Sequence, residues 1–570
     1  MQSPLITAPD AVKLPRAALL LLCVLYVAPG LLGRDPWAID DAVGFGIAHT
    51  MATGGWGDWL RPNVAGVPVL DQGPLAYWIA AVFVRLLPFL EANLAVRLAA
   101  AGWLAAALAA VWYALYGLAS RPGAQPIDPF GASPSRSDFG RAVADAGLLI
   151  LLATVGPIAR VHETTAIALQ FALTSGFLFG VVQALRTPRA GGALAGLAVG
   201  ATVMTGGVPL AAALLLAALA LVLGVRPYRL LARPFAGWLL AVAAVAGGLW
   251  PALLAGSGPA GVEHLRGWLA WNADTLVGPA RRQTLRFMAK TVFWFFWPAW
   301  PIAAWTPIGW RGRIAEPAVA VPLAVVAATG ALALASAQGS QSLLVPVAPA
   351  MAMLAGVVLP TLHRRVLSLI DWFAVAAFTV FSIAMWAYWI AYQAGMPPRM
   401  AASIVRLAPG TAPQVVPLGV AFALAATLGW MALVRWRVAR RPRALWRSVV
   451  LSSGGFVLAW SLLMTLWLPV FNYRKSYRDI AQQVASIVPP GQSCVAADGL
   501  GPAARAAFAY FGRLRLARTP QQASQCSWLL LGDQVGTRAG IPSPRDWTPM
   551  WEGRRPTDRN ERYRLYRRAG

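Results

Sequence analysis

Long apolar runs constrain this chain more than any other feature. Runs of about twenty residues recur along most of its 570 residues, and only 12% of the residues are charged. A run of that length crosses the hydrocarbon core of a bilayer as a helix, because a helix pairs its own backbone groups. The sequence therefore predicts a polytopic α-helical membrane protein. The first run, residues 16–32, has no small-residue cleavage pattern after it, which predicts a retained helix rather than a removed signal.

The arginines indicate how the chain is threaded. A net charge of +26 is compatible with nucleic-acid binding, but many arginines fall in short loops between apolar runs, which is typical of a topology signal. We therefore predict no nucleic-acid partner. The densest basic loop is predicted to be cytoplasmic, and it contains Arg435, Arg437, Arg440, Arg441, Arg443 and Arg447.

One apolar run does not fit a spanning role. Fourteen runs would put both chain ends on one side of the membrane, against the basic loops. The run 74–90 is short and contains Arg85 and Pro88, so it is predicted to lie in the outer interface. Thirteen spans remain, with the N-terminus in the cytoplasm and the C-terminus outside. Residues 34–93, 257–287 and everything after 471 then face outward, and we expect the chemistry there.

The last hundred residues differ from the rest. Helices are predicted at 477–488 and 502–511, and strands at 493–497, 527–532, 551–553 and 563–566. Such alternation predicts a C-terminal soluble α/β domain (471–570) appended to a transmembrane domain (1–470). Cys494 and Cys526 lie at two strand starts, where an outer compartment permits a disulfide; two buried thiols are the alternative.

Two adjacent carboxylates follow the first span. Asp40 and Asp41 precede a predicted interfacial helix that ends near Met51, so one interpretation is helix capping. The other is catalysis on a polar substrate at the membrane face. The two are compatible, because a fixed carboxylate is a better base.

A resemblance becomes specific in this loop. Asp40-Asp41, GDWLRPNVAGVP (57–68) and LDQGPLAYW (70–78) resemble bacterial lipid A aminoarabinose transferases. These are membrane glycosyltransferases of the C-type fold, which is shared with protein O-mannosyltransferases and oligosaccharyltransferases. The resemblance implies that Asp40 is the catalytic aspartate, and that Asp41, Asp71 and Tyr77 bind donor or acceptor. The chain departs from the family at Gln72, where lysine is usual, and at Gly73, which replaces a proline, so a cation expected to meet a phosphate is missing.

Two other outward segments hold candidate residues. The resemblance implies that Glu163 is a second catalytic carboxylate, with Arg160 and His162 beside it; the alternative is a solvated helix end. His264 and Asn272 compete for the family's histidine position, and they bind donor or acceptor in this interpretation. Arg281 and Arg282 are predicted to hold a phosphate, or alternatively to anchor the helix to anionic lipid headgroups.

No motif indicates a cofactor. The sequence has no HExxH or CxxC spacing, no DxD, no Walker loop and only four histidines. No required cofactor is therefore predicted, and a divalent metal at Asp71 and His264 is left open. A lipid-linked donor suits a site that opens sideways into the bilayer.

These features together predict an inverting glycosyltransferase that moves a pentose or hexose from a polyprenyl-phosphate donor to an envelope acceptor. The resemblance implies aminoarabinose transfer to lipid A at a bacterial inner membrane, with the C-terminal domain in the periplasm. Transfer to a protein or another glycan is an alternative. A transporter or flippase for a lipid-linked substrate is another, but it predicts internal repeats and mid-membrane charges that the sequence does not show.

Overall fold

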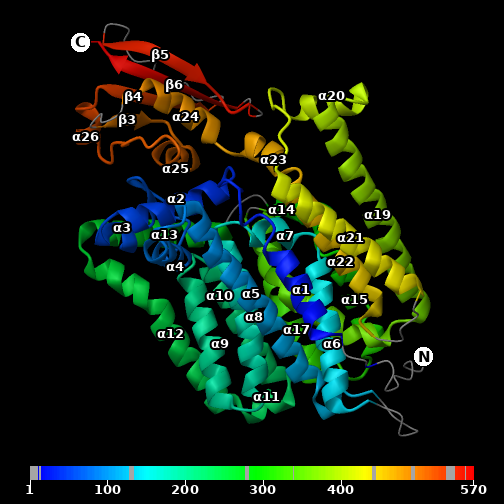
Figure 1. Cartoon of the computed structure of the whole chain (residues 1–570). Coiled ribbons are helices and arrows are strands. Elements are labelled where there is room, and N and C mark those ends of the chain that lie inside the picture. Colours follow the sequence, from blue (N-terminus) through cyan, green and yellow to red (C-terminus); the bar gives the residue numbers. More distant parts are fainter. Residues whose placement is uncertain are drawn as a thin grey trace.

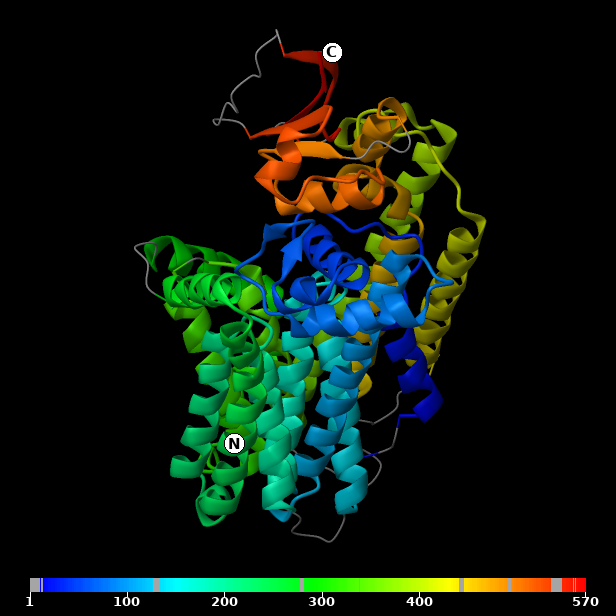
Figure 2. The ribbon, with the colours of Figure 1, turned by 90° about the vertical axis from the view of Figure 1, so that its left-hand side faces the viewer.

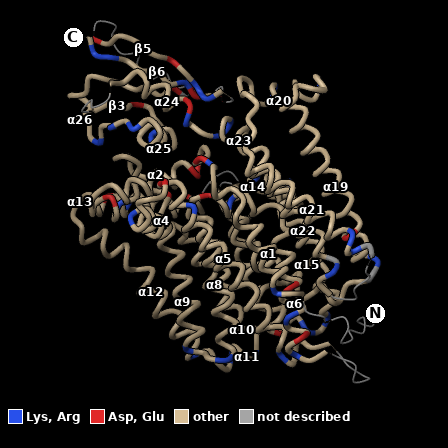
Figure 3. The backbone as a smooth tube through the Cα atoms, in the orientation of Figure 1, with Lys and Arg blue, Asp and Glu red and all other residues tan. Residues whose placement is uncertain are grey.

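The computed structural model describes residues 11, 14–126, 134–276, 281–337, 339–439, 445–489, 494–534, 546–556, 558 and 560–569. Long helices run side by side and form a bundle, and a small α/β unit lies at one end of it (Figures 1 and 2). Charged residues gather at the two ends of the bundle and in the α/β unit, whereas the middle of the bundle is nearly free of them (Figure 3).

The helices of the bundle differ in length. They are α1 (Arg16–Val27), α5 (Ala92–Ala119), α6 (Arg136–Ala153), α8 (Ala166–Ala184), α9 (Pro188–Val203), α10 (Val208–Gly224), α12 (Ala232–Gly256), α17 (Pro317–Ala335), α18 (Ala348–Val358), α19 (Arg364–Ala394), α21 (Pro417–Ala439) and α22 (Arg447–Thr465). Seven helical segments in the described residues are long and apolar enough to cross a membrane, and an eighth crossing results if the pair Val449–Thr465 and Leu468–Lys475, bent by 65°, is one span. The chain is a polytopic helical membrane protein. The number of thirteen crossings stays a prediction.

One predicted span is not a single straight helix. The apolar run near residue 291 is divided between α14 (Arg281–Phe295) and α15 (Ala299–Ala303), and Pro298 lies in the break. Proline cannot donate the next helical hydrogen bond and clashes with the preceding turn, which explains the interruption. Arg440, Arg441 and Arg443 of the predicted cytoplasmic loop lie outside the described residues.

Short elements gather at the end of the bundle that faces the α/β unit (Figure 1). They are α2 (Asp40–Thr53), α3 (Trp56–Leu60), β1 (Asn63–Val64), β2 (Val67–Pro68), α4 (Leu75–Leu86), α7 (Pro157–Val161), α13 (Pro259–Leu276) and α20 (Pro398–Leu407). The apolar helix α4 has 12 residues, so at about 1.5 Å per residue it is too short to cross a membrane. The segments predicted to face outward thus share one end of the molecule.

The C-terminal unit is built on a mixed sheet. Its elements are α24 (Arg478–Ile487), β3 (Val495–Asp498), α25 (Pro502–Tyr510), α26 (Pro520–Ser524), β4 (Trp528–Gln534), β5 (Trp547–Gly553) and β6 (Glu561–Arg568). The four strands are ordered β3-β4-β6-β5; β3 and β4 are parallel, and the other pairs are antiparallel. Buried Val484, Phe508 and Leu530 pack between the helices and the sheet. A disulfide joins Cys494 to Cys526 at the starts of β3 and β4.

This unit rests directly on α2. A Cβ atom at Gly46 of α2 would lie only 2.5 Å from the Cβ of Ala506 of α25, so the two helices touch through small residues. Arg505 donates to the carbonyl of Ala65 at 3.1 Å, and Arg518 pairs with Asp58 at 3.0 Å. The helix that begins at Asp40 is therefore held between the bundle and the C-terminal unit.

Candidate active site

Asp41 lies at the centre of a buried charge cluster. The side chain is only 2% exposed, and its oxygens accept hydrogen bonds from Arg97 at 3.0 Å, Arg34 at 3.3 Å, the Trp37 N–H at 3.1 Å and both the N–H and the hydroxyl of Thr164 at 2.8 Å. Burial alone raises the pKa of Asp41, but the two guanidinium groups and the backbone donors hold it well below its usual range. Asp41 therefore fixes the loop, and its contact with donor or acceptor stays a prediction.

Sequence reasoning missed the two arginines of this cluster. Arg97, on α5, also donates to the backbone carbonyls of Arg34, Asp35 and His162. The sequence does contain an indication of Arg97, because an arginine near the end of an apolar run is a candidate for a functional or structural charge. Arg34 follows shortly after the first apolar run, and the sequence itself indicates no further role for it.

Asp40 lies beside this cluster and faces solvent. Its side chain is 50% exposed, and its Oδ2 accepts a hydrogen bond from Arg160 at 2.8 Å. The same Arg160 nitrogen donates to Glu163 at 3.0 Å, so one guanidinium bridges both predicted carboxylates. The close approach depends on Gly44, since a Cβ there would lie 1.9 Å from the carbonyl oxygen of Thr164. The structure brings Asp40, Arg160 and Glu163 together.

His162 packs beneath this group. Its ring is buried, with Nδ1 2.6 Å from the carbonyl of Ile158 and Nε2 2.9 Å from that of Tyr26. Burial, together with the charges of Arg34 and Arg97, lowers the pKa of His162 to about 4. A neutral, enclosed imidazole supports the turn, and the binding role of His162 stays a prediction.

The departures at Gln72 and Gly73 have structural reasons. Gln72 donates to Asp71 at 3.0 Å and accepts from the hydroxyl of buried Tyr77 at 2.8 Å, so its amide links both residues. A Cβ at Gly73 would lie 2.2 Å from the carbonyl oxygen of Met204, which leaves no room for proline. Gln72 and Tyr77 thus form a neutral hydrogen-bonded pair that is joined to the carboxylate of Asp71. None of the three side chains is a cation that could bind a phosphate.

The predicted residues of α13 do not join Asp40. His264 and Asn272 are buried on one face of α13, and His264 packs near Trp250 with 6.3 Å between ring centres. Arg282 is exposed at the start of α14, and the side chain of Arg281 lies outside the described part. Among the described residues, no three His, Cys, Asp or Glu side chains are grouped to hold a metal, and a divalent metal at Asp71 and His264 stays a prediction.

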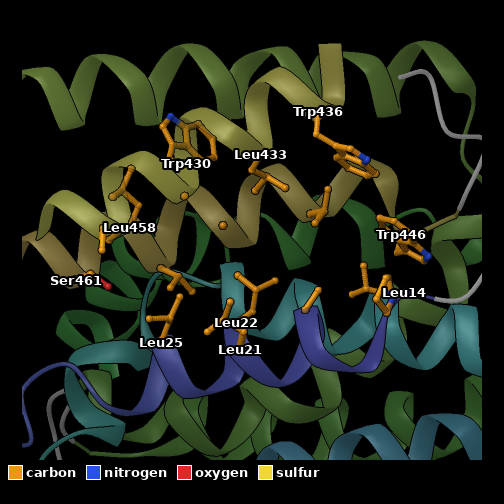
Figure 4. A pocket seen from close by; sticks show the side chains of 18 of the residues that line it. Leu14, Leu21, Leu22, Leu25, Trp430, Leu433, Trp436, Trp446, Leu458 and Ser461 are labelled. Carbon is orange, nitrogen blue, oxygen red and sulfur yellow. The ribbon is translucent and has the colours of Figure 1, made fainter. Parts of the chain in front are cut away.

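An apolar cavity leads toward the site from within the bundle. It has a volume of about 550 Å³ and lies between α1, α21 and α22, with Leu21, Leu22, Leu25, Trp430 and Leu433 among its walls (Figure 4). At one end are Leu25 and Ser461, whose chain neighbours Tyr26 and Trp460 both contact the ring of His162, with centroids 5.5 and 4.9 Å away. This end of the cavity therefore lies next to the side chains that pack on His162, the residue before Glu163.

Comparison with known proteins decides the fold. No protein-family model and no curated protein matches the chain in sequence. Among solved structures, ArnT from Cupriavidus metallidurans bound to undecaprenyl phosphate matches with a TM-score of 0.68 and 17% identity, over 96% of both chains. The chain has the ArnT fold. ArnT in the apo state matches with a TM-score of 0.64 and 16% identity, over 96% of this chain and 97% of that one.

A weaker likeness is to the archaeal oligosaccharyltransferase AglB from Archaeoglobus fulgidus, with a TM-score of 0.47 and 11% identity, over 90% of this chain and 69% of that one. The ArnT match confirms the recognition that residues 40–78 suggested, at the level of the C-type glycosyltransferase fold.

Glu163 makes this ArnT-fold site sensitive to pH. Burial raises the pKa of Glu163 to about 7, although Arg160 opposes the shift. Because the folded pKa lies above the unfolded value, the stabilisation from protonated Glu163 is present in acid and is lost as pH rises from about 4.5 through 7. Full ionisation costs roughly 3 kcal/mol, at about 1.4 kcal/mol per pKa unit.

We therefore expect the melting temperature of wild type in detergent to fall relative to that of Glu163→Gln between pH 5 and pH 8. Glu263→Gln, which changes an exposed carboxylate of α13, serves as the matched control and should follow wild type. Parallel melting curves for wild type and Glu163→Gln would show that Glu163 is ionised throughout.

Proposed function

We propose that this protein transfers a sugar from a polyprenyl-phosphate donor to an envelope acceptor, with aminoarabinose and lipid A as the first pair to test. The observation that carries the proposal is the Asp40–Arg160–Glu163 group on the ArnT fold, because it combines the solvent-exposed carboxylate of Asp40 with a cation at one face of the bundle. The bacterial inner membrane, with the C-terminal unit in the periplasm, is the proposed location.

The chemistry follows from these side chains. An acceptor oxygen attacks the anomeric carbon from the face opposite the phosphate, the bond from that carbon to the phosphate oxygen breaks, and the configuration inverts. Asp40 takes the proton of a hydroxyl acceptor, or orients a phosphate acceptor that has no proton to lose. Arg160 donates to the departing polyprenyl phosphate as its charge develops.

The apolar cavity supports a lipid-linked donor. A polyprenyl tail is hydrocarbon throughout, and the walls between α1, α21 and α22 offer apolar contacts for such a chain. The tail is proposed to enter from the bilayer and to place its phosphate at the Arg160 turn, which is the end of the cavity nearest the charged group.

The decisive experiment compares envelopes from cells with and without the gene by mass spectrometry, and repeats the transfer with purified protein. Loss of aminoarabinose from lipid A in the deletion strain, restored by wild type but not by Asp40→Asn, is the expected result. Loss of a sugar from another glycan or from a protein would change the acceptor, which the neutral Gln72 makes a specific alternative. Accumulation of lipid-linked sugar on the cytoplasmic side would contradict the proposal and indicate a flippase.

A further inference from the structure

Lys475 lies beside the loop that leads into Asp40. It is the last residue of α23 (Leu468–Lys475), and its ammonium nitrogen is 4.6 Å from the ring centre of Trp37 and 5.8 Å from that of Phe471. Aromatic faces attract a cation, so the two rings hold the side chain in place without neutralising it. Within the described residues, the ammonium group has no carboxylate partner and no hydrogen bond, and the residue is exposed. This cation is available to an incoming anion.

The backbone of Lys475 is fixed to that loop. The side chain of Asn472 accepts hydrogen bonds from the Asp35 N–H at 3.1 Å and the Trp37 indole at 3.0 Å, and it donates to the carbonyl of Gly33 at 2.7 Å. The N–H of Ala38 donates to the carbonyl of Lys475 at 2.8 Å. These four bonds keep α23 in register with the approach to Asp40, so the position of the ammonium group is determined by the fold.

Lys475 is a positive charge that is not paired with any of the described carboxylates near Asp40. The cations Arg34, Arg97, Arg160 and Lys475 face the carboxylates Asp40, Asp41 and Glu163, and the three arginines are engaged with those carboxylates. The charges of Arg34, Glu163 and Arg160 act on Lys475, which places the ammonium group in the same electrostatic environment. The loop at Asp71 and Gln72 contributes no cation. These four cations outnumber the three carboxylates by one, and Lys475 is the one with no carboxylate partner among the described residues.

We propose that Lys475 binds the phosphate of the lipid-linked substrate at this site. The proposal rests on the proposed function and names the residue that supplies the missing positive charge. An ammonium group has three N–H donors, and those that do not face the aromatic rings can donate to phosphate oxygens. The phosphate belongs either to the polyprenyl donor or to a phosphorylated acceptor, and both present the same anionic oxygens.

Binding measurements on the purified full chain test this assignment. Farnesyl phosphate, which carries the donor chemistry, and farnesol, which lacks the phosphate, are titrated against wild type, Lys475→Met, Lys475→Arg and Arg399→Met. We expect Lys475→Met to bind farnesyl phosphate about tenfold more weakly, the loss typical of one charge-assisted hydrogen bond, with farnesol binding unchanged. Lys475→Arg should retain most of the affinity. Arg399 is an exposed arginine of α20, so its variant controls for a change in surface charge.

A second titration separates the two sources of phosphate. If Lys475→Met loses affinity for phosphorylated lipid A but not for farnesyl phosphate, the acceptor supplies the phosphate. Unchanged affinity for both ligands, in a variant that melts like wild type, would overturn the proposal. The proposal would also be overturned if the wild-type protein bound neither farnesyl phosphate nor phosphorylated lipid A. Wild type that binds farnesyl phosphate through Lys475 but transfers no sugar would contradict the proposed function and leave the Lys475 site intact.

Discussion

We expect Asp40→Asn to lower the rate of the proposed sugar transfer by about a hundredfold to ten-thousandfold, the range that a positioned acid or base contributes. The reason is that Asn has the shape of Asp but cannot take a proton or carry charge. The folded state should tolerate the change, because Asp40 is half exposed and Arg160 keeps its second partner, Glu163. The rate is measured with purified protein in vesicles that contain lipid-linked sugar and acceptor.

Yield, elution profile and melting temperature of this variant should match wild type. Near-normal transfer by a well-folded Asp40→Asn variant would remove Asp40 from the mechanism. Slow transfer by a protein that also melts early would show only that the fold is damaged, so both quantities have to be measured on one preparation.

Asp41→Asn is expected to destabilise the folded protein rather than to remove a reacting group, although Asp41 is adjacent to Asp40. Removal of this charge leaves Arg34 and Arg97 buried without a carboxylate, and breaking a buried ion pair in this way costs about 3–5 kcal/mol. We expect little folded protein in detergent and a melting temperature well below that of wild type. Size-exclusion chromatography and thermal unfolding measure both.

The neighbouring Asp40→Asn variant is the matched control, since it makes the same chemical change one residue away on the exposed side. An Asp41→Asn variant as stable as wild type, but inactive, would mean that Asp41 contacts substrate and that the arginines find other partners. The two variants thus distinguish a residue that acts in the transfer reaction from a neighbouring residue that stabilises the fold.

Much of the architecture could be predicted from local pattern. The long apolar runs predict the helices of the bundle. The C-terminal strands are predicted because their shorter hydrophobic segments lie between turns and helices. The break at Pro298 was missed because hydropathy does not register a single proline. The count of crossings stays a prediction, since several bundle helices are too short or too polar for length and composition alone to decide.

The site was predictable where one residue carries its own signal. Asp40 and Glu163 are carboxylates in an apolar chain, and the structure connects them through Arg160, 120 residues along from Asp40. Asn472 gives no such signal. It is an ordinary amide in the sequence, and only the fold brings it into contact with Asp35, which is 437 residues away along the chain. The same is true of Lys475, whose contact with Trp37 depends on the fold. His264 and Tyr77 show the converse, because a polar residue type on an outward segment can still be used for packing.

The short helix α23 has a consequence for how this protein can be divided. A boundary at residue 471 separates an apolar part from a water-facing part by composition, yet Asn472, Lys475 and Arg478 beyond it hold the Gly33–Ala38 loop, with Arg478 bound to Asp35 through both carboxylate oxygens. In a chimera joined at that boundary, the residues that hold the loop before Asp40 come from the other parent. Recombinants that exchange only the outer sheet must therefore be joined after Arg478.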